Sequence, residues 1–173
     1  RVMGKRSSFE RIPRDFYPTP EAAVQPLLPH LAPNSQFIEP CAGDGRLAVH
    51  LAKLGHICVG ASDIEPRGIG IRTIDAREIV GRGLFITNPP WDRPVLHAII
   101  ENLCKQAPTW LLFDSDWMHT KQAAPFMPWL RKIVSVGRVK WIEDSPHTGK
   151  DNCCWYLFDA SEQTAAEFIG RAA

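Results

Sequence analysis

One short segment of the chain combines residues that could activate a weak nitrogen nucleophile. The apolar run 85–87 leads directly into Asn88, Pro89, Pro90 and Trp91. An exocyclic amine or an amide nitrogen reacts poorly because its lone pair is delocalised. The Asn88 side-chain oxygen and the Pro89 carbonyl can each accept one N–H bond from such a nitrogen and free its lone pair for attack. The two prolines stiffen the backbone, so these acceptors are preorganised.

The aromatic residue of this segment suggests what the nitrogen belongs to. Trp91 offers a flat face to a nucleobase that has left its helical stack, and such stacking contributes about 1–3 kcal/mol per base. The alternative is an ordinary proline turn after a strand, with Trp91 in the core. A second motif upstream favours the chemical interpretation.

That second motif is a small-residue loop between an acidic strand end and a helix. Residues 37–47 read FIEPCAGDGRL, and Gly43 and Gly45 allow a tight turn and a close approach of the backbone to a ligand. With Ala48 the loop satisfies the dinucleotide pattern G-x-G-x-x-G/A. Asp63, at the end of the next strand, is suited to hydrogen-bond a ribose diol.

Two cofactors fit this glycine pattern, and charge separates them. A nicotinamide dinucleotide would place its pyrophosphate at the helix N-terminus, where Glu39 and Asp44 would repel it. S-adenosylmethionine carries an ammonium and a sulfonium instead, which carboxylates suit. The sequence therefore favours the methyl donor over the dinucleotide.

Further residues are candidates for holding this cofactor, and each has a structural alternative. Asp75, followed by Ala76, could accept from the adenine amino group or be a solvent-exposed turn acid. Ile64 could pack against the adenine. The segment Tyr17-Pro18-Thr19 could line the methionine end, although Thr19 is also a good helix N-cap ahead of Pro20. The expected cofactor set is Tyr17, Pro18, Thr19, Glu39, Pro40, Cys41, Ala42, Gly43, Gly45, Asp63, Ile64, Asp75, Ala76 and Asn88.

Substrate candidates follow the later strands. Asp116 and Trp117 could border the substrate pocket, or belong to a loop with one buried aromatic residue. Lys150 could lie near a phosphate, or in a plain hairpin loop. The tryptophans outside these segments are expected in core or hairpin packing; they are Trp110, Trp129, Trp141 and Trp155.

Apolar runs that alternate with helix-like stretches must position these residues. We expect a Rossmann-like, doubly wound α/β sheet, mostly parallel, with an antiparallel C-terminal hairpin. The predicted strands are 36–39, 57–62, 69–73, 84–87 and 110–114, with 133–142 and 154–158 as the hairpin. The predicted helices are 45–54, 95–105, a proline-distorted 122–132, and a last one from an N-cap at Ser161 towards Gly170.

Composition limits the class of protein. The 173 residues suit one catalytic domain, 15–173, after a basic tail, 1–14, that either touches phosphates or is simply solvated. The net charge is only +1, and no apolar run approaches the roughly 18–20 residues that span a bilayer. None of the five cysteines has zinc-ligand spacing, so we expect reduced thiols, no metal and a cytoplasmic protein without membrane contact.

These motifs resemble those of class I S-adenosylmethionine-dependent methyltransferases, in particular the DNA N6-adenine (amino) branch. Residues 15–20, 39–45 and 88–91 match its cofactor, glycine-loop and catalytic motifs in its order, and Asp63 and Asp75 stand where the family places acids. The resemblance implies S-adenosylmethionine as cofactor, S-adenosylhomocysteine as product, and adenine N6 in DNA as acceptor.

The departures from the family bear on specificity. The 15 residues after Phe158 suit about one helix, so we expect no target-recognition domain of the kind in the larger enzymes, as in small phage or prophage forms. Sequence choice would then rest on loops or on a specificity partner, in a bacterial or phage-infected cell. Related motifs also occur in enzymes that methylate RNA or a protein glutamine. A cofactor-binding accessory subunit is a third interpretation.

Overall fold

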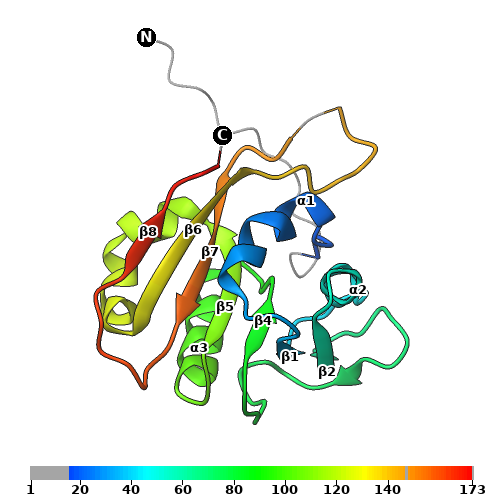
Figure 1. Ribbon diagram of the computed structural model, residues 1–173, viewed down its shortest axis with the longest axis horizontal. Helices are drawn as coiled ribbons and strands as arrows, with labels where there is room; N and C mark the ends of the chain where they lie inside the picture. Colours follow the sequence, from blue (N-terminus) through cyan, green and yellow to red (C-terminus); the bar gives the residue numbers. More distant parts are fainter. Residues whose placement is uncertain (1–15, 147, 173) are drawn as a thin grey trace.

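The computed structural model describes residues 16–146 and 148–172, which form a single eight-stranded sheet with the order β3-β2-β1-β4-β5-β7-β6-β8 (Figure 1). The strands are β1 (Gln36–Glu39), β2 (Ile57–Asp63), β3 (Arg72–Thr73), β4 (Phe85–Thr87), β5 (Thr109–Asp114), β6 (Leu130–Arg138), β7 (Asn152–Phe158) and β8 (Glu167–Ile169). The α-helices are α1 (Glu21–Val24), α2 (Arg46–Lys53) and α3 (Arg93–Cys104), and the 3₁₀ helices are η2 (Gln25–His30), η3 (Ser115–His119) and η4 (Lys121–Trp129).

The strand directions confirm the predicted fold class. The neighbours β3, β2, β1, β4 and β5 pair in parallel, whereas β7 runs antiparallel to both β5 and β6. The sheet is therefore mostly parallel with an antiparallel C-terminal hairpin. The basic tail predicted at 1–14 lies outside the described residues.

Helices cover both faces of the sheet, as a doubly wound fold requires. On one face, α1 and α2 bury Val24, Leu47 and Leu51 against Trp155. On the other face, α3 buries Leu96, Ile99, Ile100 and Leu103 against an aromatic cluster of the sheet and of η3 and η4. Their i, i+3 and i+4 spacing places these α3 residues on one helix face, and burying each contributes about 1.5–3 kcal/mol.

The helix predicted at 122–132 is a 3₁₀ helix that ends earlier. η4 ends at Trp129, and Leu130 already begins β6. Pro125 and Pro128 lack the N–H that an α-helix would use, so the segment takes a tighter and more irregular helical form.

The predicted C-terminal helix is wrong, because the segment instead ends in β8, which pairs in parallel with β6 (Figure 1). The Ser161 hydroxyl donates to Asp159 Oδ1 at 2.6 Å rather than capping a helix. The buried Arg131 guanidinium donates to the carbonyls of Glu162 and Thr164 and holds this stretch in a non-helical course. These tertiary bonds outweigh the helix propensity of Ala165 and Ala166.

The parallel strands end at one edge of the sheet, where ligands bind in open α/β folds. β1, β2, β4 and β5 all reach this edge, and the loops after β1, β2, β3 and β4 carry most of the predicted site residues. None of the helices formed by residues 16–146 and 148–172 is long and apolar enough to cross a membrane.

Candidate active site

A pocket of about 520 Å³ opens at this edge. It is within the size range of small-molecule sites. It gathers most of the predicted cofactor residues, namely Tyr17, Pro18, Thr19, Glu39, Pro40, Cys41, Ala42, Gly43, Asp63, Ile64, Asp75, Ala76 and Asn88. The wall also includes residues that were not predicted for the site, namely Phe16, Leu47, Glu65, Arg67, Arg77, Asp92, Val95 and Ile99. Gly45 is not in this wall; it is the left-handed N-cap of α2, with φ of 83°.

The glycine loop is fastened to the end of β2. Gly43 has a left-handed φ of 55°, and its N–H donates to Asp63 Oδ2 at 2.8 Å. Asp63 Oδ1 accepts from the Glu65 N–H, also at 2.8 Å. A carboxylate offers about four lone-pair sites, so Asp63 is fixed in place and retains capacity for the hydroxyls of a ribose.

Glu39 is an acid buried in the pocket floor. Its side-chain Oε2 accepts from the Ala48 N–H at 3.1 Å, and only 2% of the residue is exposed. Burial raises the pKa of Glu39 well above its ordinary value, and the charges of Asp44 and Asp63 add to this effect. The arrangement favours a positively charged ligand group, because a nearby cation stabilises the ionised form of Glu39.

Asp75 stands in the pocket wall, but as one half of an ion pair. Arg77 Nη2 lies 2.5 Å from Asp75 Oδ2, and Arg77 Nε lies 3.0 Å from both carboxylate oxygens. This hydrogen bonding lowers the pKa of Asp75. Asp75 therefore lines the pocket together with its partner Arg77, and its role as an acceptor for the adenine amino group stays a prediction.

Asn88 lies where the N-terminal segment meets the loop after β4. Its Nδ2 donates to the Tyr17 carbonyl at 3.0 Å. The Asn88 side-chain amide is thereby oriented, and its Oδ1 is left to accept from a ligand in the pocket that Asn88 lines. One residue earlier, Thr87 Oγ1 accepts from the Cys41 N–H at 3.2 Å and ties this loop to the glycine loop.

The rest of the predicted catalytic segment follows directly. Pro90 lines the pocket, whereas Pro89 and Trp91 are not in its wall. Trp91 is half-buried and packs against both core clusters. Its Nε1 donates to the Leu112 carbonyl at 3.2 Å. The core alternative for Trp91 is thus partly correct, because one edge of the ring is anchored in the fold.

Trp141 packs against a core cluster, as expected, and also contacts Trp91, which the sequence did not reveal. It belongs to the loop between β6 and β7, yet its ring meets Trp91 edge to face, with centroids 5.6 Å apart and an interplanar angle of 82°. The Tyr17 ring lies 6.3 Å from the Trp141 ring. Three segments far apart in sequence thus contribute aromatic rings to one cluster, Tyr17, Trp91 and Trp141.

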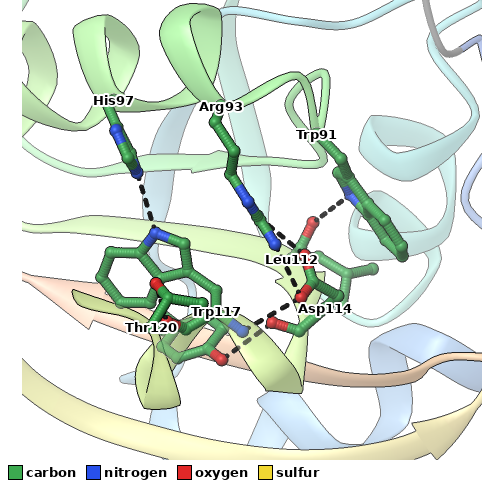
Figure 2. Close-up of polar contacts among 8 residues, drawn as sticks. Trp91, Arg93, His97, Leu112, Asp114, Trp117 and Thr120 are labelled. Carbon is green, nitrogen blue, oxygen red and sulfur yellow. Dashed lines mark hydrogen bonds and ion pairs between the residues drawn. The ribbon is translucent and has the colours of Figure 1, made fainter. Parts of the chain in front are cut away.

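The predicted substrate residues lie away from the pocket wall that the described residues form. Trp117 is fully buried, and its Nε1 donates to His97 Nε2 at 3.0 Å (Figure 2). The alternative of one buried aromatic residue after β5 is therefore the one that the structure has. Asp116 and Lys150 are exposed outside that wall.

Comparison with known proteins identifies the fold. No protein-family model and no curated protein matches the chain. Solved structures do match it. A dimethyladenosine transferase from Plasmodium falciparum gives a TM-score of 0.57 at 13% identity, over 83% of this chain and 62% of that one. The 23S rRNA methyltransferase ErmE gives 0.53 at 14% identity, over 82% and 68%.

The M protein of the type I restriction enzyme EcoKI gives a TM-score of 0.53 at 12% identity. That match covers 81% of this chain but only 43% of the M protein. The chain thus has the class I methyltransferase fold, with the pocket at the edge of the sheet where such folds bind ligands.

Proposed function

We propose that this protein transfers a methyl group from S-adenosylmethionine to an exocyclic amino nitrogen, and that the acceptor is adenine N6 in DNA. The observation that carries the proposal is the oriented side-chain amide of Asn88 at an acidic pocket. Its nitrogen is bound by the Tyr17 carbonyl, so an oxygen acceptor is what remains for the incoming amine.

The pocket residues fit the cofactor in charge and in shape. When bound, S-adenosylmethionine supplies an electrophilic methyl group on a sulfonium. Glu39, Asp44 and Asp63 surround the pocket with carboxyl groups that suit the cationic end of this molecule and its ribose hydroxyls. Ile64, which is half exposed in the wall, offers an apolar surface for a purine.

The acceptor side of the mechanism rests on Asn88 and Pro89. The Asn88 Oδ1 and the Pro89 carbonyl each accept one N–H of the amine, which localises the nitrogen lone pair for attack on the methyl carbon. The new N–C bond forms as the S–C bond breaks. The methylated nitrogen is then acidic and gives its extra proton to water, so no strong base is required. Trp91 and Trp141 provide aromatic surface for the base that carries the amine.

A nucleic acid is the acceptor that we favour over a protein glutamine. One similar structure is named a dimethyladenosine transferase, which supports adenine as the target base, and another is the M protein of a type I restriction enzyme, which supports DNA as the polymer. The rRNA methyltransferase among the similar structures supports RNA as the second candidate. We place the enzyme in the cytoplasm of a bacterial or phage-infected cell, with sequence choice supplied by loops or by a partner.

Parallel transfer assays test this proposal. Purified protein is incubated with tritiated S-adenosylmethionine and, separately, with duplex DNA, single-stranded DNA, total RNA and denatured protein, next to the Asn88→Ala variant. We expect label in DNA that depends on Asn88. Label found only in RNA or only in protein would show that this polymer, and not DNA, is the acceptor. Label that appears only after a second protein is added would indicate an accessory subunit.

A further inference from the structure

The backbone of the catalytic segment has few anchors of its own. β4 ends at Thr87 and α3 begins at Arg93, so residues 88–92 lie between two regular elements. Pro89 and Pro90 have no N–H to donate, which removes two backbone hydrogen bonds from the segment. Besides the bond from Asn88 to the Tyr17 carbonyl, side chains that flank the segment can therefore help to place Asn88 and Pro89.

Arg93 supplies such an anchor on the downstream side. Its Nη2 donates to Asp114 Oδ1 at 2.9 Å, and its Nη1 lies 2.8 Å from Asp114 Oδ2 (Figure 2). The Nη2 contact is a charge-assisted hydrogen bond, whereas Nη1 is close to Oδ2 as an ion pair without hydrogen-bond geometry. The pair joins the first residue of α3 to the last residue of β5.

Asp114 is itself held rigidly. It is buried, and its Oδ1 also accepts from the Trp117 N–H at 3.0 Å. Its backbone carbonyl accepts from the Tyr156 hydroxyl of β7 at 2.9 Å. The guanidinium of Arg93 is thus bound to a carboxylate that β5, β7 and η3 fix in place.

A second link runs parallel to the first. The Trp91 indole N–H donates to the Leu112 carbonyl of the same strand, as Figure 2 shows. Trp91 is thus bound to Leu112, and Arg93 to Asp114. The two bonds are two residues apart along the chain at the end of the catalytic segment and two residues apart in β5. The two links together define the distance and the orientation of the catalytic segment relative to β5.

Helix stability does not account for an arginine at this position. A cation at the first position of an α-helix is opposed by the positive end of the helix dipole. Neither Arg93 nor Asp114 is among the described residues that line the pocket, although Pro90 and Asp92 are. Any effect of the pair on chemistry must pass through the segment between them and the pocket.

We propose that Arg93 and Asp114 form a positioning pair that sets the location of residues 88–91, and hence of the two oxygen acceptors. Its catalytic meaning rests on the proposed function. The positioning itself is a property of the fold and can be measured without an acceptor.

The test uses three variants and one matched control in the full chain. Arg93→Met removes the charge and both contacts, Asp114→Asn weakens the pair from the other side, and Arg93→Lys restores charge with a single contact. The control, Lys105→Met, removes the exposed ion pair between Glu101 of α3 and Lys105, the C-cap residue of that helix. NMR measures hydrogen exchange at the Trp91 indole N–H, with the Trp155 indole, which donates to the Ala23 carbonyl, as an internal reference.

We expect Arg93→Met to speed exchange at the Trp91 indole at least tenfold while exchange at Trp155 stays as in the wild type. Affinity for S-adenosylmethionine should change less than threefold, and kcat on DNA should fall about 10- to 100-fold, since a displacement near 1 Å can cost that much. Arg93→Lys should partly restore both the slow exchange at Trp91 and the wild-type kcat. Lys105→Met should match the wild type in both measurements.

Unchanged exchange at Trp91 in both Arg93→Met and Asp114→Asn would overturn the proposal, as would equal acceleration at Trp91 and Trp155. Should Arg93→Met fail to fold, Asp114→Asn decides by the same readout. If the wild type methylates no acceptor while Trp91 loosens selectively, the proposed function fails and the positioning pair stands.

Discussion

The side-chain amide of Asn88 donates to the backbone carbonyl of Tyr17 at 3.0 Å, across 71 positions of sequence. This bond orients the Asn88 amide, because the side-chain nitrogen is bound while the oxygen accepts from no residue in the ranges 16–146 and 148–172. It also joins the two segments on which the proposed chemistry depends, the N-terminal wall of the pocket and the loop after β4. The same contact that shapes the pocket therefore orients the acceptor oxygen.

Asn88→Ala should separate binding from chemistry. Loss of the Oδ1 acceptor removes an interaction that acts on the amine in the transition state, so transfer should fall about 10²–10³-fold. The dissociation constant for S-adenosylmethionine, measured by calorimetry, should stay within a few-fold of the wild type. Gln163→Ala, which removes an exposed amide far along the chain, is the control and should match the wild type in both. A parallel loss of binding and transfer would contradict the assigned role.

Glu39 should make folding and cofactor binding depend on pH. Its pKa is raised by burial, so between its ordinary value of 4.5 and the raised value the folded state keeps a proton that the unfolded chain has lost. The free energy of unfolding contributed by this group therefore falls as pH rises through that window. Chemical denaturation of the ligand-free protein at several pH values measures this slope, which Glu39→Gln should remove.

The same raised pKa predicts that S-adenosylmethionine binding releases a proton. The ligand's cation stabilises ionised Glu39, so affinity should increase as pH rises through the window. Calorimetry in two buffers of different ionisation enthalpy counts the protons released. An identical count for the wild type and Glu39→Gln would show that another group is responsible.

Gly43→Ala should weaken cofactor binding through a specific clash. The added Cβ would lie 2.7 Å from Cε2 of Phe16, at a backbone φ of 55° that also disfavours any side chain. Gly55→Ala is a matched control, because Gly55 shares a positive φ of 88° but a Cβ there meets nothing within 4 Å. We expect at least a tenfold weaker affinity in the first variant and wild-type affinity in the second, at comparable cost to stability. Equal affinities in the two variants would mean that the Phe16 contact is irrelevant.

Trp141→Ala should impair use of the acceptor more than binding of the cofactor. The ring lies against Trp91 and Tyr17, and loss of one stacking surface costs about 1–3 kcal/mol, or roughly 5- to 150-fold in kcat/KM for the nucleic acid. Trp141→Phe should keep most of the activity. Trp129→Ala removes a half-buried tryptophan that packs on Phe126 and serves as the control. Wild-type kinetics in Trp141→Ala would show that Trp141 does not contribute to acceptor binding.

Sequence patterns correctly predicted the helices and strands whose conformation is determined by residues close together in the chain. The strand 36–39 and the helix after the glycine loop follow from apolar periodicity and from glycines that tolerate a positive φ. The parallel sheet follows from the alternation of these elements. The C-terminal strand was missed because Ser161 and the alanines after it favour a helix locally, whereas Arg131 and the open edge of β6 determine the outcome.

The site residues that sequence analysis missed are those whose neighbours are distant in the chain. Trp141 carries no local signal, and only the path of the β6–β7 loop brings it to Trp91. The pairing of Arg93 with Asp114 requires knowing that β4 and β5 are adjacent and in register. The pairing of Arg77 with Asp75 is local, because the two residues are only two positions apart, but the sequence alone does not give the orientation of the Arg77 side chain.

Mass spectrometry of nucleosides tests the central claim most directly. Duplex DNA is incubated with the protein and S-adenosylmethionine, digested to nucleosides and compared with a reaction run with Asn88→Ala. The account predicts N6-methyldeoxyadenosine with the wild type and at least a hundredfold less with the variant. A wild-type protein that binds S-adenosylmethionine yet leaves deoxyadenosine unmodified, or a variant that methylates as well as the wild type, would contradict it.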